Sequence, residues 1–433
     1  MRVTAKFDRK LIWYRGNSVR YLVVRVTDPG EGTARAKAAL SLSLVVDASG
    51  SMAGAPLQFA VDAAQRVVRQ LSSEDRLSVV SFDESVTDHI ASEPMTDAGR
   101  ERALKALEGI RVGGSTNLSG GWLRGAEHVA RHMESGSGLQ NRVIVLSDGH
   151  ANAGITDPAE LAEHARQLSE RGLYSSTVGI GDGYHGATLE AIAVQGGGLH
   201  HRAARPHEII EVVTAELEEI RLTAAEHINL VIRHAPDVRI KSLNEFPTSH
   251  TAGESSCRLG SLASGASRVA IFSVKFPACE PGTQCAFEVQ TTWREPGAMD
   301  IFSSEPVTLH ATSAEGKDNN AQPYDPALTE EIAKVWQAKI VRQIVQLNRE
   351  GRYAESLKRL DMDLPLFTKY AEHAADGVEL IAELQRLREV VNREWSEGSR
   401  KEIEVAMHKR AYSRLDARSQ QPAPWSASLP DKQ

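Results

Sequence analysis

The feature that most constrains the fold is an alternation of short apolar runs with helix-period segments between about residues 40 and 219. Residues 40–46 (LSLSLVV) form one apolar, β-like run, and residues 142–146 (RVIVL) form another. Between them, apolar residues from Leu57 to Leu71 recur at spacings of three and four, which marks one face of a helix. Strands that alternate with helices build a mostly parallel sheet with helices on both faces. The pattern therefore predicts a doubly wound α/β domain.

The other segments of this region continue the alternation. Further strands are expected at residues 76–82 and 174–180. At Thr156-Asp157-Pro158, a capping side chain precedes a proline at the first helical position, which is a typical helix start. Helices are expected near residues 98–110, 118–133, 158–170 and 187–194.

The flanking regions carry β-like segments instead. Two or three strands ahead of the α/β domain cannot make a stable sheet alone. We therefore predict that residues 1–37 join residues 223–313 in one β-sandwich, into which residues 38–222 are inserted. The expected strands lie at residues 3–7, 19–26, 228–232, 268–274 and 286–292.

The last third of the chain has a helical sequence pattern instead of a β-like one. A polar linker is expected at residues 314–327, followed by a helical region at 328–415, where Gly351 is placed to end a helix. The end of the chain, 416–433, is rich in Pro, Ser and Gln and is expected to be disordered.

Composition excludes several classes of protein. The 433 residues include 50 Lys and Arg against 57 Asp and Glu, so the net charge of −7 gives no support for nucleic-acid binding. Three cysteines are too few for a disulfide framework. The first residues lack the apolar run of a secretion signal, and no stretch is apolar for long enough to span a membrane. We therefore expect a cytoplasmic protein.

Oxygen-bearing side chains follow two of the expected strands. Asp47, Ser49 and Ser51 close the first strand, and Asp148 closes a later one. A glycine-flanked loop that contains Thr116 lies between them in the sequence, just before a helix. Ligands bind where the carboxyl ends of parallel strands open into a crevice. Oxygen-only ligands suit a hard divalent cation, of which Mg²⁺ is the natural choice.

These residues resemble the metal-ion-dependent adhesion site (MIDAS) of von Willebrand factor type A (VWA) domains. The segments VVDASGSM, DRLSVVSF, GGSTNLSGGW and VIVLSDG occur in the order and spacing of that family, over about residues 40–220. The placement of the domain between β segments, with a helical tail, is similar to a group of bacterial multidomain VWA proteins.

The resemblance implies a role for each residue. Ser49 and Ser51 would bind Mg²⁺, or alternatively Mn²⁺ or Ca²⁺, directly. Thr116 would bind it when a ligand is engaged, and Asp47 and Asp148 would act mostly through bound water. The sixth position would take a Glu or Asp carboxylate from a partner protein. The chain would then be a non-enzymatic adaptor or scaffold.

The resemblance also bears on regions outside the metal ligands. Family members often couple ligand binding to a shift of the last helix, which would be residues 206–220 here. His150, Asp182 and His185 are expected to lie on the partner-binding rim. Cys279 and Cys285 are expected to be buried or free thiols.

Other functions stay open at this level. The chain is alternatively a regulatory or substrate-presenting subunit of an ATPase, kinase or phosphatase complex. A secreted adhesin and a metal-dependent hydrolase are the less favoured alternatives. The sequence has no G-x-S-x-G elbow and no phosphate loop, and serines committed to a cation are poor nucleophiles. We therefore expect that the chain is not an enzyme.

Overall fold

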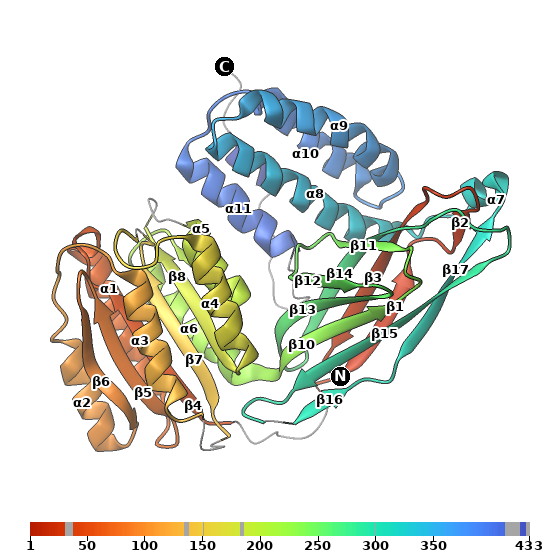
Figure 1. Cartoon of the computed structure of the whole chain (residues 1–433). Helices are drawn as coiled ribbons and strands as arrows, with labels where there is room; N and C mark the ends of the chain where they lie inside the picture. Colours follow the sequence, from red (N-terminus) through yellow and green to blue (C-terminus); the bar gives the residue numbers. More distant parts are fainter. Residues whose placement is uncertain are drawn as a thin grey trace.

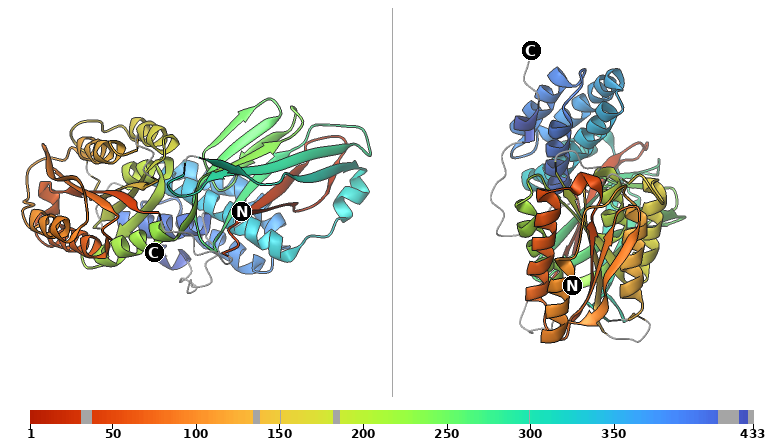
Figure 2. Two further views of the ribbon diagram at one scale, coloured as in Figure 1. Left: turned by 90° about the horizontal axis from the view of Figure 1, so that it is seen from below. Right: turned by 90° about the vertical axis from the view of Figure 1, so that its left-hand side faces the viewer.

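The structure is a computed structural model that describes residues 1–30, 38–133, 138–149, 151–181, 186–298, 300–411 and 425–429. It has an α/β region, a β-sandwich and a helical bundle (Figure 1). The α/β region lies to the left in Figure 1, the sandwich to the right, and the bundle above the junction between them. The two further views in Figure 2 agree with this arrangement.

The α/β region is built on a twisted sheet whose central strands are parallel. The strand order is β6-β5-β4-β7-β8-β9, and only the pairing of β6 with β5 is antiparallel in the part of the chain that the structure describes. The central strands are buried along their whole length because helices cover both faces. The strand bounds are β4 (Leu40–Asp47), β5 (Arg76–Phe82), β6 (Val86–Pro94), β7 (Gln140–Ser147), β8 (Leu173–Ile180) and β9 (Gly197–Ala203).

Helices pack on each face of this sheet and give it two apolar cores. One core joins α1, α2 and α6 to the Leu42 and Leu44 face of β4. The other joins α3, α4 and α5 to the Val45 face. Asp157 caps α4, and Asn117 caps α3 by accepting a hydrogen bond from the Gly120 N–H. The helix bounds are α1 (Ala55–Gln70), α2 (Asp97–Leu107), α3 (Leu118–Ala130), α4 (Pro158–Glu170), α5 (Gly186–Gln195) and α6 (Glu208–Leu222).

The sandwich combines strands from both sides of the α/β region. One sheet has the order β1-β3-β14-β11, so the N-terminal strands pair with a strand more than 200 residues later. The other sheet has the order β12-β13-β10-β15-β17-β2, and β16 pairs with β15. The bounds are β1 (Arg2–Phe7), β2 (Leu11–Trp13), β3 (Val19–Thr27), β10 (Thr223–Arg233), β11 (Arg239–Ser242), β12 (Thr248–Thr251), β13 (Glu254–Ala263), β14 (Ser267–Lys275), β15 (Gln284–Arg294), β16 (Ile301–Ser303) and β17 (Val307–Ala314).

The helical bundle covers the outer face of the first sheet of the sandwich. Tyr21 of β3 and Ile271 of β14 belong to the same apolar cluster as Ile332 and Tyr370 of the bundle. Trp336 packs against Tyr21 with their ring centroids 5.7 Å apart, so this tryptophan serves internal packing. The bounds are α7 (Gly316–Ala321), α8 (Pro326–Arg349), α9 (Tyr353–Ala371), α10 (Gly377–Val390), α11 (Glu397–Ala411) and the 3-10 helix η2 (Trp425–Ser428).

The predicted fold class is confirmed: a doubly wound sheet lies within a β-sandwich and precedes a helical region. The expected linker, 314–327, differs in detail because it contains the short helix α7. The expected disorder of 416–433 is wrong at Trp425–Ser428, which forms η2. The Trp425 side chain is only 3% exposed, because it packs into the apolar core of the bundle. No helix in the described part of the chain is both long and apolar enough to cross a membrane.

Candidate metal centre

Asp47 anchors the candidate site at the carboxyl end of the central strand β4. Its side chain is fully buried and accepts hydrogen bonds from Ser49 and Ser147. The Ser49 N–H donates to Oδ1 over 2.9 Å, and the Ser147 hydroxyl donates to Oδ2 over 2.5 Å. These bonds tie Asp47 both to its own loop and to the neighbouring strand β7, so the orientation of the carboxylate is fixed.

The surroundings of Asp47 disfavour its negative charge. Burial raises the pKa of Asp47 to about 6. The hydrogen bonds from Ser147 and Ser49 oppose this rise, whereas the negative charge of Asp148 adds to it. A cation bound nearby would offset both the burial of the Asp47 charge and its repulsion by Asp148.

Ser49 and Ser51 bring their hydroxyls together next to Asp47. The two Oγ atoms are 3.2 Å apart. Ser49 is buried and Ser51 is exposed, so the pair reaches from the interior to the surface. The 3-10 turn η1 (Gly50–Met52) holds the two serines, and the buried Met52 side chain fixes that turn in the core.

The glycine-flanked loop that carries Thr116 is bonded to the Asp47 loop. The Gly113 N–H donates to the carbonyl of Ala48 over 2.7 Å, and the Gly50 N–H donates to the carbonyl of Gly114 over 2.9 Å. A Cβ at Gly113 would lie 1.7 Å from Oδ2 of Asp83, so the loop approaches this side chain too closely for any residue larger than glycine unless Asp83 moves. The glycines thus allow the two loops to meet.

Thr116 and Asp148 are the two remaining predicted metal ligands. Both side chains are buried, and Asp148 directly follows β7. The segment after β7 is bonded to the Thr116 loop: Asn152 accepts from the Thr116 N–H over 2.7 Å and donates its own N–H to the Thr116 carbonyl. The structure therefore brings the predicted residues to one edge of the sheet.

Some positioning residues were not identified from the sequence. Ser147 accepts from the Gly149 N–H over 2.8 Å while it donates to Asp47, so it links two loops of the site. Its place at the end of a predicted strand, beside Asp148, is a signal that points to it. Asn152 and Glu84, which accepts from the Ser115 N–H over 3.1 Å, carry no such signal. Their roles depend on loops that meet only in three dimensions.

The donor set fits a hard cation. It consists of two carboxylates and three hydroxyls, contributed by Asp47, Asp148, Ser49, Ser51 and Thr116, and oxygen donors are those that Mg²⁺ and Ca²⁺ prefer. The described residues contain no cluster of three or more His, Cys, Asp and Glu side chains. A site for a softer ion is therefore not apparent among them. The predicted rim residues His150, Asp182 and His185 lie outside the described residues.

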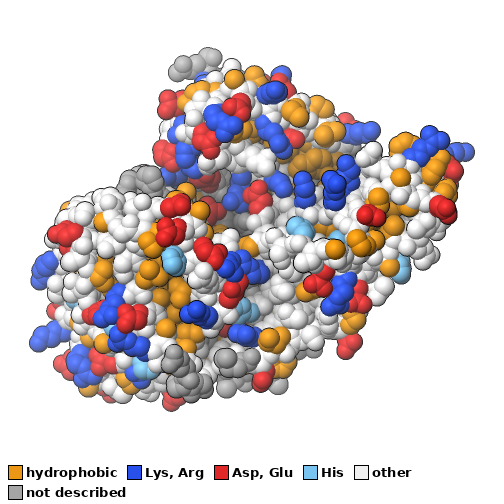
Figure 3. Space-filling view, in the orientation of Figure 1, with side chains coloured by type: hydrophobic (Ala, Val, Ile, Leu, Met, Phe, Trp, Pro, Cys, Tyr) orange, Lys and Arg blue, Asp and Glu red, His pale blue; other side chains and the backbone are white. Residues whose placement is uncertain are grey.

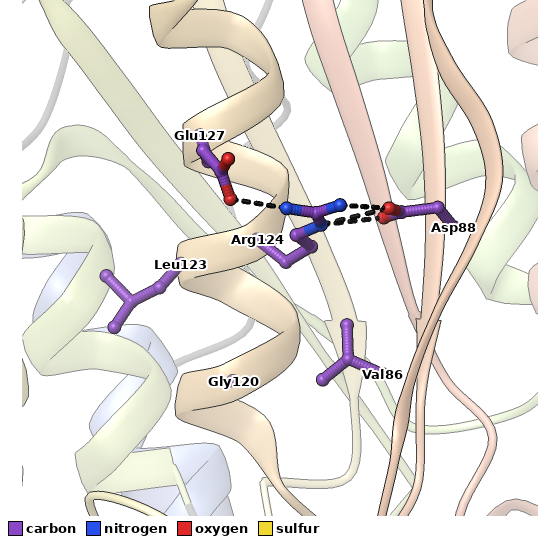
Figure 4. A pocket seen from close by; sticks show the side chains of 6 residues that line it. All are labelled: Val86, Asp88, Gly120, Leu123, Arg124 and Glu127. Carbon is purple, nitrogen blue, oxygen red and sulfur yellow. Dashed lines mark hydrogen bonds and ion pairs between the residues drawn. The ribbon is translucent and has the colours of Figure 1, made fainter.

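A separate hollow of about 420 Å³ lies on the flank of the same region, between β6 and α3 (Figure 4). Arg124 projects into it and is paired with Asp88 on one side and Glu127 on the other. The hydrogen bond from Arg124 is the main cause that lowers the pKa of Asp88 to about 2. The charged side chains that line this hollow are thus paired with one another.

Comparison with known proteins agrees with this geometry. Residues 42–212 match the family model of the von Willebrand factor type A domain. The α/β region of this chain is therefore a VWA domain.

Two relatives are similar in sequence to part of this chain. An uncharacterized protein from Synechocystis is 25% identical over 314 residues, which cover 70% of this chain and 73% of that protein. The rat inter-alpha-trypsin inhibitor heavy chain H3 is 28% identical over 168 residues, which cover 37% of this chain but only 19% of that protein.

Solved structures show the same fold over nearly the full length. A von Willebrand factor type A protein from Catenulispora acidiphila has a TM-score of 0.72 at 16% identity, and the match covers 96% of this chain and 97% of that one. The ArnB paralog VWA2 from Sulfolobus acidocaldarius has a TM-score of 0.60 at 16% identity and covers 95% of this chain and 98% of that one. These similarities concern the fold alone.

Proposed function

We propose that this chain is a non-enzymatic adaptor whose VWA domain binds an acidic side chain of a partner protein through a divalent cation, with Mg²⁺ as the expected ion. The observation that carries this proposal is the meeting of Asp47, Ser49, Ser51, Thr116 and Asp148 at the carboxyl edge of one sheet. Mg²⁺ demands oxygen ligands and keeps several waters, which this mixed set of carboxylates and hydroxyls permits.

Each residue has a distinct part in this proposal. The hydroxyls of Ser49, Ser51 and Thr116 would hold the cation directly, and Asp47 and Asp148 would hold it mainly through water. When bound, the cation supplies a positive charge and an open coordination position for an external carboxylate. The Ser147 hydroxyl and the Ser49 N–H keep Asp47 oriented for this purpose.

Bulk electrostatics cannot replace the cation in this recognition. The chain carries a net charge of −7, which repels an acidic partner. On the face shown in Figure 3, acidic and basic side chains are interspersed over the VWA domain at the left, so this face offers no broad positive patch. Attraction for a carboxylate therefore has to come from one local charge.

The first test measures the metal alone. Calorimetric titration of the full chain with Mg²⁺ is expected to show binding, and Ser49→Ala is expected to weaken it by at least about tenfold. Ser115→Ala is the matched control, because Ser115 is an exposed serine in the adjoining loop whose hydroxyl is not assigned to the metal. Equal affinities for the wild type and Ser49→Ala would contradict the proposed metal site.

The second test addresses the partner. Proteins captured from host lysate by the immobilised chain are compared with Mg²⁺, with EDTA, and with Thr116→Ala. A partner bound through the cation is expected to be lost in both the EDTA and the Thr116→Ala samples. Capture that survives both would show that the partner binds elsewhere and would remove the metal centre from its recognition.

A further inference from the structure

Four basic side chains gather where the helical bundle meets the sandwich. Arg239 and Lys241 belong to β11, and Lys275 is the last residue of the neighbouring strand β14. The fourth, Lys339 of α8, donates a hydrogen bond to the carbonyl of Ser242 over 3.1 Å, which brings it beside β11. In Figure 3, basic side chains gather along the junction between the bundle and the sandwich. These four basic residues are called the basic patch.

The register of the strands places the patch on the outer face of the sheet. Arg239 lies directly opposite Lys275 in the ladder between β11 and β14. Ile240 packs into the sandwich core, so its neighbours Arg239 and Lys241 point to the opposite face of the sheet. Val19 of β3 is the residue opposite Lys275 on its other side, and it is 38% exposed. The bundle therefore leaves this row of the sheet open to solvent.

The positive charges of the patch are not compensated within the described part of the chain. Arg239, Lys241 and Lys275 are exposed, and none of the four basic side chains forms an ion pair with a described residue. Like charges directly opposite each other on two strands destabilise a sheet. Burial lowers the pKa of Lys339, and the positive charge of Lys241 acts in the same direction, whereas Glu245 opposes it. An anion bound at the patch would relieve this repulsion.

We propose that the basic patch is a second interaction surface, which binds an acidic segment of a partner protein. Carboxylates supply the negative charge that the patch lacks, so the two surfaces are complementary. The remainder of the chain is more acidic than the net charge of −7, because the patch itself is positive. A nucleic acid or an anionic membrane would extend past the patch and be repelled there, whereas a short acidic segment would not. The patch lies outside the VWA domain, so this binding does not require the metal centre.

The experiment measures the binding of a fluorescein-labelled deca-glutamate peptide to the full chain by fluorescence anisotropy. The chain is first freed of divalent metal with a chelating resin, so that a failure of this inference is distinguishable from a failure of the proposed metal site. Saturable binding is expected, and it should weaken as the NaCl concentration rises from about 50 to 300 mM. An alternating Gly-Ser peptide of the same length is the uncharged control.

Charge reversal within the patch is compared with the same reversal elsewhere. Lys241→Glu/Lys275→Glu is expected to weaken peptide binding at least about tenfold, because two attractions become repulsions. The matched control is Arg66→Glu/Lys105→Glu, which makes the same change in net charge at exposed positions of the VWA domain. The affinity of this control should stay within about twofold of that of the wild type.

A milder variant separates binding from folding. Lys275→Gln removes the repulsion opposite Arg239, so it is expected to weaken peptide binding while its unfolding temperature equals or exceeds that of the wild type. A residue that serves only the fold would not show this combination.

Three results would overturn the inference. One is a wild-type chain that shows no saturable binding of the deca-glutamate peptide. Another is equal weakening in the two double variants, which would show that binding follows the net charge and not the patch. The third is tighter binding of a decathymidylate oligonucleotide or of phosphatidylserine vesicles than of the peptide, lost in Lys241→Glu/Lys275→Glu. That result would assign the patch to a nucleic acid or a membrane.

Discussion

The two ends of the VWA sheet differ in where their polar side chains lie and in what these side chains contact. At the carboxyl end, hydroxyls and carboxylates gather in loops that reach the surface at Ser51. At the amino end, Arg142 of β7 forms an ion pair with Glu226 of β10, and both side chains are almost completely buried, at 5% and 7% exposure. Arg142 also lies over the Tyr174 ring, with its guanidinium 4.4 Å from the ring centroid. One end of the sheet therefore carries the candidate metal ligands, and the other attaches the domain to the sandwich.

This difference teaches how one sheet serves two purposes. A buried ion pair adds little net stability to the fold. Removal of either partner is strongly destabilising, because it leaves the other charge buried and unpaired. Such a pair therefore favours one way of docking the two surfaces. An exposed hydroxyl such as that of Ser51 can be removed at small cost to the fold. Substitutions at the amino end should therefore affect stability, whereas those at the carboxyl end should affect binding.

The largest effect is expected for Glu226→Ala. This change leaves the Arg142 charge buried without its partner and is expected to lower the free energy of unfolding by about 3–5 kcal/mol. Urea denaturation followed by circular dichroism measures this loss. The matched control is Glu288→Ala, which breaks the ion pair between Arg233 and Glu288, whose side chains are 50% and 41% exposed. The control should cost less than about 1 kcal/mol, and equal losses would contradict the comparison.

A smaller effect is expected for Asp75→Asn, also at the amino end. Asp75 accepts hydrogen bonds from the Leu40 N–H over 2.8 Å, the Ser72 N–H over 2.7 Å and Arg221 over 2.7 Å. It thus joins the start of β4, the end of α1 and the end of α6. The substitution is expected to lower the free energy of unfolding by about 1.5–3 kcal/mol, as for hydrogen bonds to a charged group.

The pH dependence of this loss provides a check. Burial alone would raise the pKa of Asp75, but the hydrogen bonds from Leu40 and Arg221 outweigh it and lower the pKa below its usual value. A lowered carboxylate pKa stabilises the fold above the unfolded pKa of about 3.9. The difference between the wild type and Asp75→Asn should thus be constant from about pH 7 to 5 and shrink below about pH 4. A constant difference throughout would contradict the role of the charge.

The smallest effect on stability is expected for Ser51→Ala at the carboxyl end. In EDTA, the exposed side chain should change the free energy of unfolding by no more than about 0.5 kcal/mol. In Mg²⁺, the wild type should unfold at a higher temperature, because a ligand that binds only the native state stabilises it. Ser51→Ala should lose most of this rise. Scanning calorimetry of both chains measures it, and an equal rise would argue against Ser51 as a ligand.

Apolar periodicity was sufficient to predict most elements of the VWA domain. The helix expected at 158–170 has those bounds, and the strand expected at 40–46 is observed as Leu40–Asp47. β6 and β9 were not predicted, since both lie at the edges of the sheet and have few fully buried residues. α9 lies within the helical region expected at 328–415, although it contains Pro365, a residue that usually breaks or kinks a helix.

The residues of the candidate site were likewise predicted only in part. Asp47, Ser49, Ser51, Thr116 and Asp148 were predicted as metal ligands from residue types and spacing, and the structure brings them together; whether they bind a metal stays a prediction. Ser147, Asn152 and Glu84 were not predicted, because hydrogen bonds between loops distant in sequence give them their roles.

The sequence by itself determined the alternation of strands and helices and the set of oxygen donors, because burial periodicity and ligand chemistry are local properties of the chain. The tertiary structure decided which distant segments meet. It paired β3 with β14, buried the Arg142–Glu226 ion pair between the VWA domain and the sandwich, and placed Trp425 in the core of the bundle. These contacts depend on the packing of complementary surfaces, which cannot be predicted from a local sequence pattern.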